Sequence, residues 1–197
     1  SQGGIGYLLM QAFENNLREA NSARHVVCLL TQVEVDPNDL AFDEPTKPVG
    51  SFFSEAGAVD LERELGWAMR EDAGRGWRHV VPSPLPRHIV DISLIDALIR
   101  RGTVVIAGGG GVPVVRGAKG VRQGISAVID KDLTSALMAN VLKIPVMMIL
   151  TAVPKVAIHF GTPRQRELDT VTLLELKALH ADGHLPAGSM GPKVEAA

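Results

Sequence analysis

The chain has 197 residues, about 1.3 times a typical single-domain length, which predicts one domain with an insertion rather than two equal domains. Hydrophobic residues make up 46% of the chain and charged residues 21%, which excludes a disordered, collagen-like or coiled-coil protein. The formal net charge is −2, so the composition favours neither nucleic acid nor an anionic membrane as a general partner.

The single cysteine, Cys28, cannot form an internal disulfide, which fits a reducing compartment and predicts a cytoplasmic protein. No apolar run approaches the roughly 20 residues that cross a bilayer, and the first residues lack the pattern of a signal peptide, so no membrane association is expected. Ser1 directly precedes a helical pattern, and another helical pattern has only begun at Pro192 when the sequence stops. We interpret this as a partial chain.

The chain opens with a predicted helix and a predicted strand. His25–Thr31 is a short apolar run rich in β-branched residues, which indicates a buried parallel strand. Before it, from Gly4 onward, an amphipathic helix is predicted by apolar residues on one stripe: Ile5, Leu8, Leu9, Ala12, Phe13 and Leu17.

Residues 34–77 predict an insertion that protrudes as a small subdomain. Its first part, 34–50, is rich in Asp, Asn and Pro, which favours turns and edge strands. Residues 58–73 have helical spacing, and Gly74 and Gly76 are expected to end that helix. A strand around Val80 then returns the chain to the main core.

The second half alternates strands and helices, which predicts an α/β fold: a three-layer α/β/α arrangement with a mostly parallel sheet. Ligands of such folds bind at the carboxyl ends of the strands. The predicted helices cover 89–101, 130–142 and 172–181, the last opened by a capping box at Thr172 and Glu175, and the predicted strands cover 103–107 and 146–150.

Four consecutive glycines, Gly108–Gly111, follow the predicted strand at 103–107. Without Cβ atoms, the backbone there can direct amide N–H groups at an oxyanion. The alternative is a tight strand-to-loop turn, which needs only one or two glycines. The run is not a Walker A motif, because no Gly-Lys-Ser/Thr follows it.

Two lysines stand at predicted helix starts, where the helix dipole disfavours a cation unless an anion is also bound. Lys131 follows the predicted N-cap Asp130 and precedes Asp132, and Lys193 ends a second glycine-containing loop, Gly188–Lys193. Either lysine alone could be an ordinary exposed side chain. Together, beside glycine loops, they favour phosphoryl transfer, in which catalysis is mostly positioning and charge neutralisation.

The remaining polar and aromatic residues indicate structure rather than chemistry. The six histidines show no metal-ligand spacing, so no protein metal site is expected. Cys28, within an apolar strand, is expected to be a buried, inert thiol. Trp67 and Trp77 flank the insertion helix and are expected to pack against it.

Eight segments spread over the whole chain resemble the carbamate kinases, which have the amino acid kinase fold. The segment Pro45–Gly50 in particular separates these enzymes from acetylglutamate and uridylate kinases. The others are Ser1–Tyr7, Thr31–Asp39, Glu71–Trp77, Val81–Pro84, Gly108–Pro113, Ala127–Asp132 and Gly188–Lys193.

The resemblance implies reversible phosphoryl transfer between ATP and carbamate, giving ADP and carbamoyl phosphate, with Mg²⁺, in a homodimer. It implies that Lys131 and Lys193 contact the transferring phosphoryl group and the nucleotide phosphates, that Asp132 orients them, and that Lys47 is presented over the site by the subdomain. Nucleotide and phosphate contacts are further implied for Gly109, Gly110, Gly111, Asp130, Thr151, Ala152, Val156, Met190, Gly191 and Pro192.

The sequence also departs from the family pattern. Where many members have a Leu-Thr-Asp-Val-Asp stretch, this chain has Leu150–Pro154 with Ala152 and Pro154 at the aspartate positions. The family's Gly-Gly-Asn and Gly-Asn-Gly-Pro loops are not in these 197 residues. The alternative is therefore an inactive nucleotide-binding or assembly module of the same fold.

Overall fold

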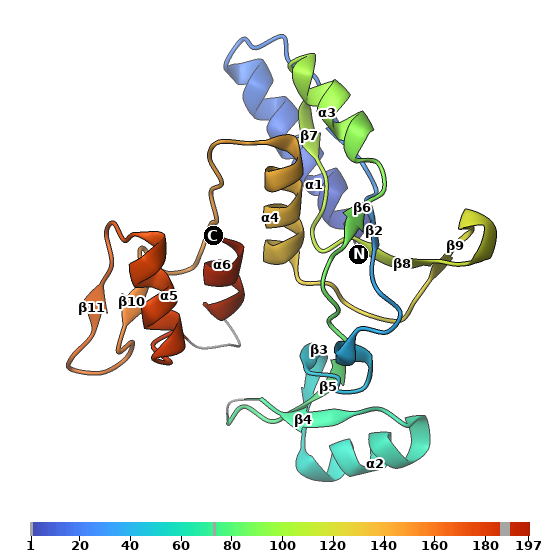
Figure 1. Ribbon diagram of the computed structural model, residues 1–197, viewed down its shortest axis with the longest axis vertical. Helices are drawn as coiled ribbons and strands as arrows, with labels where there is room; N and C mark the ends of the chain where they lie inside the picture. Colours follow the sequence, from blue (N-terminus) through green and yellow to red (C-terminus); the bar gives the residue numbers. More distant parts are fainter. Residues whose placement is uncertain (1, 73, 186–189) are drawn as a thin grey trace.

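The computed structural model describes residues 2–72, 74–185 and 190–197 (Figure 1). No helix within these ranges is both long and apolar enough to cross a membrane. The helices are α1 (Gln2–Glu19), α2 (Glu55–Leu65), α3 (Ile92–Arg100), α4 (Lys131–Leu142), α5 (Leu173–Ala181) and α6 (Gly191–Ala196), with short 3₁₀ segments at Leu40–Phe42 and Ala118–Gly120. The strands are β1 (Val26–Cys28), β2 (Gln32–Glu34), β3 (Lys47–Phe53), β4 (Met69–Glu71), β5 (Trp77–Val81), β6 (His88–Ile89), β7 (Val104–Ile106), β8 (Val112–Arg116), β9 (Arg122–Gly124), β10 (Ala157–Ile158) and β11 (Arg166–Glu167).

Two parallel strand pairs build the centre of the molecule and confirm the α/β class. β1 pairs with β7, with Val26 opposite Val104, and β2 pairs with β8, with Gln32 opposite Val112. β6 and β9 add antiparallel edges, so the larger sheet runs β6-β2-β8-β9. A buried apolar cluster lies between this sheet and the helices: Val33, Val35, Ile89, Ile95 and Ile129.

A separate three-stranded sheet, β3-β5-β4, carries α2 and lies apart from the main body at the lower end of the view in Figure 1. We call it the outlying sheet, residues 47–81. It begins later than the predicted insertion and ends later, because β2 belongs to the main sheet and β5 continues to Val81. The boundaries 34 and 77 stay a prediction about domain organisation.

The helix predicted over 58–73 corresponds to α2, which is shorter than predicted and begins earlier in the chain. α2 begins at Glu55, with Ser54 as N-cap, and ends at Gly66, which adopts the left-handed conformation with φ 65°. Gly66, rather than Gly74 or Gly76, therefore stops the helix, since glycine takes this conformation without a Cβ penalty. Met69 is buried as the first residue of β4 and not on a helix face.

The prediction of a strand over 146–150 is wrong. The segment has no regular structure, since no strand in the described ranges pairs with it, and a strand needs a neighbour for its backbone hydrogen bonds. Its side chains still alternate as in a strand. Met147 and Ile149 are half-buried beside α4, whereas Val146, Met148 and Leu150 are 73–85% exposed.

α1 is helical as predicted, but its apolar stripe does not face the core. The side that packs against β1 carries Gly6, where an added Cβ would lie 2.2 Å from Cys28 Sγ. Cys28 is half-buried rather than fully buried. The predicted stripe leaves several large side chains exposed, namely Ile5, Leu8, Leu9 and Phe13.

Candidate functional site

The glycine run after β7 forms a loop in which every residue has a positive φ. The φ angles of Gly108, Gly109, Gly110 and Gly111 are 83°, 64°, 89° and 85°. A Cβ on Gly110 would lie 2.5 Å from Ile129 O, and one on Gly111 would lie 2.3 Å from Val33 Cγ2. The positive φ angles favour glycine at all four positions, and at Gly110 and Gly111 the close neighbours leave no room for a Cβ.

Three successive amides of this loop lack a hydrogen-bond partner among the described residues, and they differ in exposure: Gly109 is exposed, Gly111 is half-buried and Gly110 is buried. Within the described part of the chain, the N–H groups of Gly109, Gly110 and Gly111 donate to no other group. Gly109 faces open space, since nothing lies within 4 Å of the position its Cβ would occupy. Successive backbone N–H groups in such a loop form an anion-binding concavity.

The N-terminus of α4 lies against this loop and carries two buried carboxylates. Asp130 is the N-cap, as predicted: its Oδ1 accepts from the N–H groups of Asp132 at 2.8 Å and Leu133 at 3.4 Å. Asp130 and Asp132 are only 6% and 7% exposed. Carboxylates at this end of a helix are favoured by its dipole.

Three lysines surround these two carboxylates, and two of them, Lys47 and Lys193, come from distant segments. Lys47, the first residue of β3, donates to Asp130 Oδ2 at 2.6 Å. Lys193, from α6, donates to Asp132 Oδ2 at 2.9 Å, and Lys131 Nζ lies 3.4 Å from the same oxygen. The structure thus brings together all four residues predicted to be catalytic, and three lysines against two aspartates leave one positive charge in excess.

The Asp130 carboxyl is ionised in this setting. Burial by itself would raise its pKa, but the hydrogen bond from Lys47, the Asp132 and Leu133 amides and the charge of Lys47 together outweigh burial. The pKa of Asp130 therefore lies below its usual value. Lys47 therefore forms an ion pair with the same carboxylate that caps α4.

A mostly apolar pocket of about 360 Å³ begins at the same lysine cluster, because Lys193 is part of its lining. Among the residues predicted to bind nucleotide, Thr151, Ala152 and Met190 line it. Val156 is half-buried between two lining residues, Lys155 and Ala157. The full lining is Leu150, Thr151, Ala152, Val153, Lys155, Ala157, Phe160, Met190 and Lys193.

Two other predicted residues are near this pocket without lining it. Gly191 is buried and begins α6, and Pro192 occupies its first turn, as the sequence predicts. Gly188 and Ser189, which open the predicted Gly188–Lys193 loop, lie outside the described residues.

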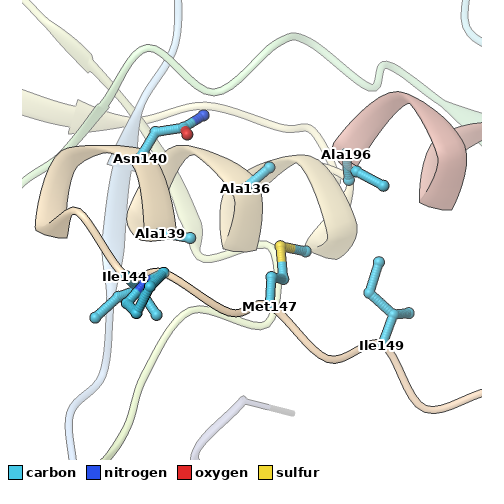
Figure 2. A pocket seen from close by; sticks show the side chains of 9 residues that line it. Ala136, Ala139, Asn140, Ile144, Met147, Ile149 and Ala196 are labelled. Carbon is cyan, nitrogen blue, oxygen red and sulfur yellow. The ribbon is translucent and has the colours of Figure 1, made fainter. Parts of the chain in front are cut away.

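A second cavity, of about 320 Å³, lies between α4, the segment 144–149 and α6 (Figure 2). None of the predicted site residues lines it, and Asn140 is its one polar side chain. Across the described ranges, no group of three or more His, Cys, Asp or Glu side chains is arranged to hold a metal ion.

Sequence reasoning missed three residues that contact the glycine loop. The Thr31 hydroxyl accepts from the Gly108 N–H, the Thr134 hydroxyl donates to Gly110 O, and Gln2 donates to Gly108 O. Thr31 stands just after a parallel strand, and Thr134 lies one turn after the N-cap Asp130. These two positions could have been used, from the sequence alone, to identify both threonines as candidates.

The chain is similar over nearly its whole length to known proteins. The model of the amino acid kinase family matches residues 30–197. The chain is 49% identical over 198 residues to the carbamate kinase of Pyrococcus furiosus and 50% identical over 198 residues to that of Staphylococcus haemolyticus, covering all of this chain and 63% and 64% of the relatives. It is also 49% identical over 196 residues to the carbamate kinase-like protein YahI of Escherichia coli, covering 98% of this chain and 62% of that protein.

Solved structures give the same result. The structure of the carbamate kinase of Giardia lamblia bound to AMP-PNP superposes with a TM-score of 0.87 at 48% identity, covering all of this chain and 62% of that one. The chain thus spans less than two thirds of the length of these relatives.

Proposed function

Because the chain belongs to the amino acid kinase family, we propose that it carries the lysine-rich side of a carbamate kinase active site. The reaction is reversible phosphoryl transfer between ATP and carbamate, giving ADP and carbamoyl phosphate. The choice of carbamate is supported by identities near 49% to carbamate kinases. The observation that carries the proposal is the convergence of Lys47, Lys131 and Lys193 on two aspartates beside an open glycine loop.

The lysine cluster suits a migrating phosphoryl group because its charge is not fully neutralised by the aspartates. Phosphoryl transfer needs little covalent chemistry from the protein and depends on positioning and on stabilising negative charge. We assign Lys131 and Lys193 to the phosphoryl and nucleotide phosphate oxygens, with Asp132 holding both ammonium groups. Lys47 reaches the same place from the outlying sheet, and the amides of Gly109, Gly110 and Gly111 donate to the phosphoryl oxygens.

In the direction of ATP formation, a β-phosphate oxygen of ADP attacks the phosphorus of carbamoyl phosphate. The bond from phosphorus to the carbamate oxygen breaks as the bond to ADP forms, and carbamate leaves as an anion. Both sides of this reaction carry the same total charge, so the step needs no proton transfer. The cations need only follow the negative charge from one side of the phosphorus to the other.

The apolar pocket is assigned to the nucleotide base. Its walls include Leu150, Ala152, Val153, Phe160 and Met190, and apolar walls with few polar groups are typical of small-molecule sites. Lys193 joins this pocket to the aspartate cluster, so a nucleotide with its base in the pocket can place its phosphates at the lysines. Val156, Gly191 and Pro192 contribute backbone around this position.

Magnesium is expected for the reaction, but the described residues do not form a protein site for it. Asp130 and Asp132 each already accept from lysine ammonium groups, and no third ligand stands with them. Mg²⁺ is commonly held by one or two carboxylates together with substrate phosphates and water. We therefore assign Mg²⁺ to the nucleotide, and no step above depends on it.

We further propose a cytoplasmic homodimer acting on small molecules. This follows from the resemblance to carbamate kinases and from the single cysteine. Light scattering during size-exclusion chromatography measures the assembly directly. A monomer at micromolar concentration would contradict the proposed dimer without bearing on the chemistry.

Titration calorimetry with AMP-PNP tests the site on this chain. Lys193→Met removes the ammonium and keeps the aliphatic stem, and we expect it to weaken binding about tenfold or more, since charge-assisted hydrogen bonds are worth about 1.5–3 kcal/mol. Lys177→Met, an exposed lysine on α5, is the matched control and should bind as the wild type does. Equal affinities in all three proteins would remove Lys193 from the nucleotide site.

A further inference from the structure

The glycine loop is held at both ends by buried hydroxyl groups. Thr31 Oγ1 accepts from the N–H of Gly108 at 2.8 Å, and Thr134 Oγ1 donates to the carbonyl of Gly110 at 3.1 Å. Thr31 is 1% exposed and Thr134 is fully buried. Water cannot replace either contact, so loss of a hydroxyl would leave a buried backbone group without a partner.

On the Gly108 side, the direction of each hydrogen bond is fixed. The Thr31 hydroxyl has one proton, which it donates to Leu29 O at 3.0 Å, so it can only accept from Gly108. Gln2 closes the arrangement: its Oε1 accepts from the Thr31 N–H at 3.1 Å, and its Nε2 donates to Gly108 O. Both polar groups of the Gly108 backbone are thereby paired.

On the Gly110 side, Thr134 joins the loop to the helix that carries the charged cluster. Its single hydroxyl proton is shared between two carbonyl oxygens, Gly110 O and Asp130 O one helical turn earlier, each 3.1 Å from Oγ1. The same turn contains Asp130, Lys131 and Asp132. Thr134 therefore fixes where the open amides stand relative to the lysines.

We propose that Thr31 and Thr134 are positioning residues that hold the N–H groups of Gly109, Gly110 and Gly111 in place for phosphoryl oxygens. The proposal rests on the proposed function. Four glycines with positive φ can adopt many other conformations, so a loop without these two contacts would have to order itself when the anion binds. Donors fixed in advance bind an anion without that cost.

Nuclear magnetic resonance of the whole chain labelled with ¹⁵N-glycine tests the proposal. In the wild type, the paired and buried Gly108 amide should exchange slowly with solvent, the exposed Gly109 amide should exchange fast, and the amide signals of Gly109, Gly110 and Gly111 should shift when inorganic phosphate is added. Equal exchange at Gly108 and Gly109 would overturn the arrangement, and this measurement needs no variant.

The variants Thr31→Val and Thr134→Val remove a hydroxyl and keep the shape of the side chain. Each should raise the dissociation constant for phosphate about tenfold, which is the size expected for the loss of one buried hydrogen bond. Thr31→Ser and Thr134→Ser keep the hydroxyl and should stay within about twofold of the wild type. Thr170→Val, an exposed threonine, is the control for the substitution itself.

The outcomes separate this inference from its premise. Phosphate could shift the loop amide signals and bind with equal affinity to the wild type and to both valine variants. That result would overturn only the positioning role. A wild-type loop that does not respond to phosphate would overturn the anion site of the proposed function, and this inference with it. If the two hydroxyl groups had only a structural role, the valine variants would have a lower melting temperature, and the folded variants would bind phosphate as tightly as the wild type does. Should one valine variant not fold, the other tests the opposite end of the loop.

Discussion

The three lysines of the site differ in how tightly they are held. Lys47 and Lys193 have 32% and 19% of their side chains exposed and are within 3 Å of a carboxylate oxygen, whereas Lys131 is 63% exposed and lies 3.4 Å from Asp132. Lys131 therefore contributes little to folding, since exposed pairs are worth about 0–1 kcal/mol. An exposed, weakly paired cation beside the proposed anion site is free to move towards a ligand.

We accordingly expect Lys131→Ala to lower turnover by about 10²–10³ while barely changing stability, by analogy with removal of one preorganised donor. The measurement is ATP formation from ADP and carbamoyl phosphate by the native polypeptide that contains these residues, with thermal unfolding in parallel. Near-normal ATP formation by this variant would show that Lys131 does not contact the phosphoryl group.

The Asp130 carboxylate predicts a pH dependence of stability. Its pKa in the folded protein is lower than in the unfolded chain, so the stabilisation is present above the unfolded value of about 3.9 and is lost as the pH falls through the folded value. Asp130→Asn keeps the capping oxygen and removes the charge. The wild type should be more stable than this variant at neutral pH, and the difference should shrink in urea unfolding below about pH 4. A difference that stays constant from neutral to acid pH would contradict this assignment.

At the scale of elements, a single ion pair among the described residues joins the outlying sheet to the main body. Lys47–Asp130 is the one ion pair within the described residues that connects residues 47–81 to the rest of the chain. The other ion pairs of this sheet and α2 are internal, such as Arg78 with Asp72. A small sheet attached in this way can close over a substrate and open again.

Lys47→Ala should therefore impair turnover and leave the affinity for ATP alone nearly unchanged, because Lys47 comes from the outlying sheet and does not line the pocket proposed for the base. Calorimetric ATP affinity and turnover, measured on the same preparation, separate the two effects. Equal losses in both quantities would instead make Lys47 part of the resting nucleotide site.

At the scale of the whole molecule, large apolar surfaces are open to solvent. They lie on α1 and along 146–150, and Leu8, Met148 and Leu150 are among the most exposed apolar residues. Apolar surface of this kind and strand-like segments without a neighbour favour aggregation. The described elements supply the lysines and the glycine loop of the proposed site, and the chain covers 63% of the length of the Pyrococcus furiosus relative.

We therefore predict that purified residues 1–197 have no detectable kinase activity, although nucleotide binds weakly near Lys193. In-line transfer needs donors on both sides of the phosphorus, and a misplaced group loses much of the rate. A coupled assay of ATP formation decides the matter. Turnover proportional to the amount of a homogeneous sample would show that this chain is sufficient.

Features set by neighbours in sequence could be predicted directly. Asp130 caps α4 and Thr172 forms a capping box with Glu175, because both motifs involve residues within one turn. The run of four glycines also indicated an unusual backbone conformation, which the positive φ angles of Gly108–Gly111 confirm. The role of Lys47, by contrast, came only from resemblance to a family, since a single loop lysine has no distinctive local pattern.

The sequence by itself determined the α/β class and the N-caps of α4 and α5, and it singled out the lysines and glycines proposed to bind phosphate. The tertiary structure alone decided which of them meet, because Lys47 and Asp130 are 83 residues apart and Asp132 and Lys193 are 61 apart. It also decided that residues 146–150 are not a strand and that the apolar stripe of α1 lies outside. Both outcomes depend on a neighbouring element: a strand forms only where another strand supplies hydrogen bonds, and an apolar face is buried only where another surface covers it.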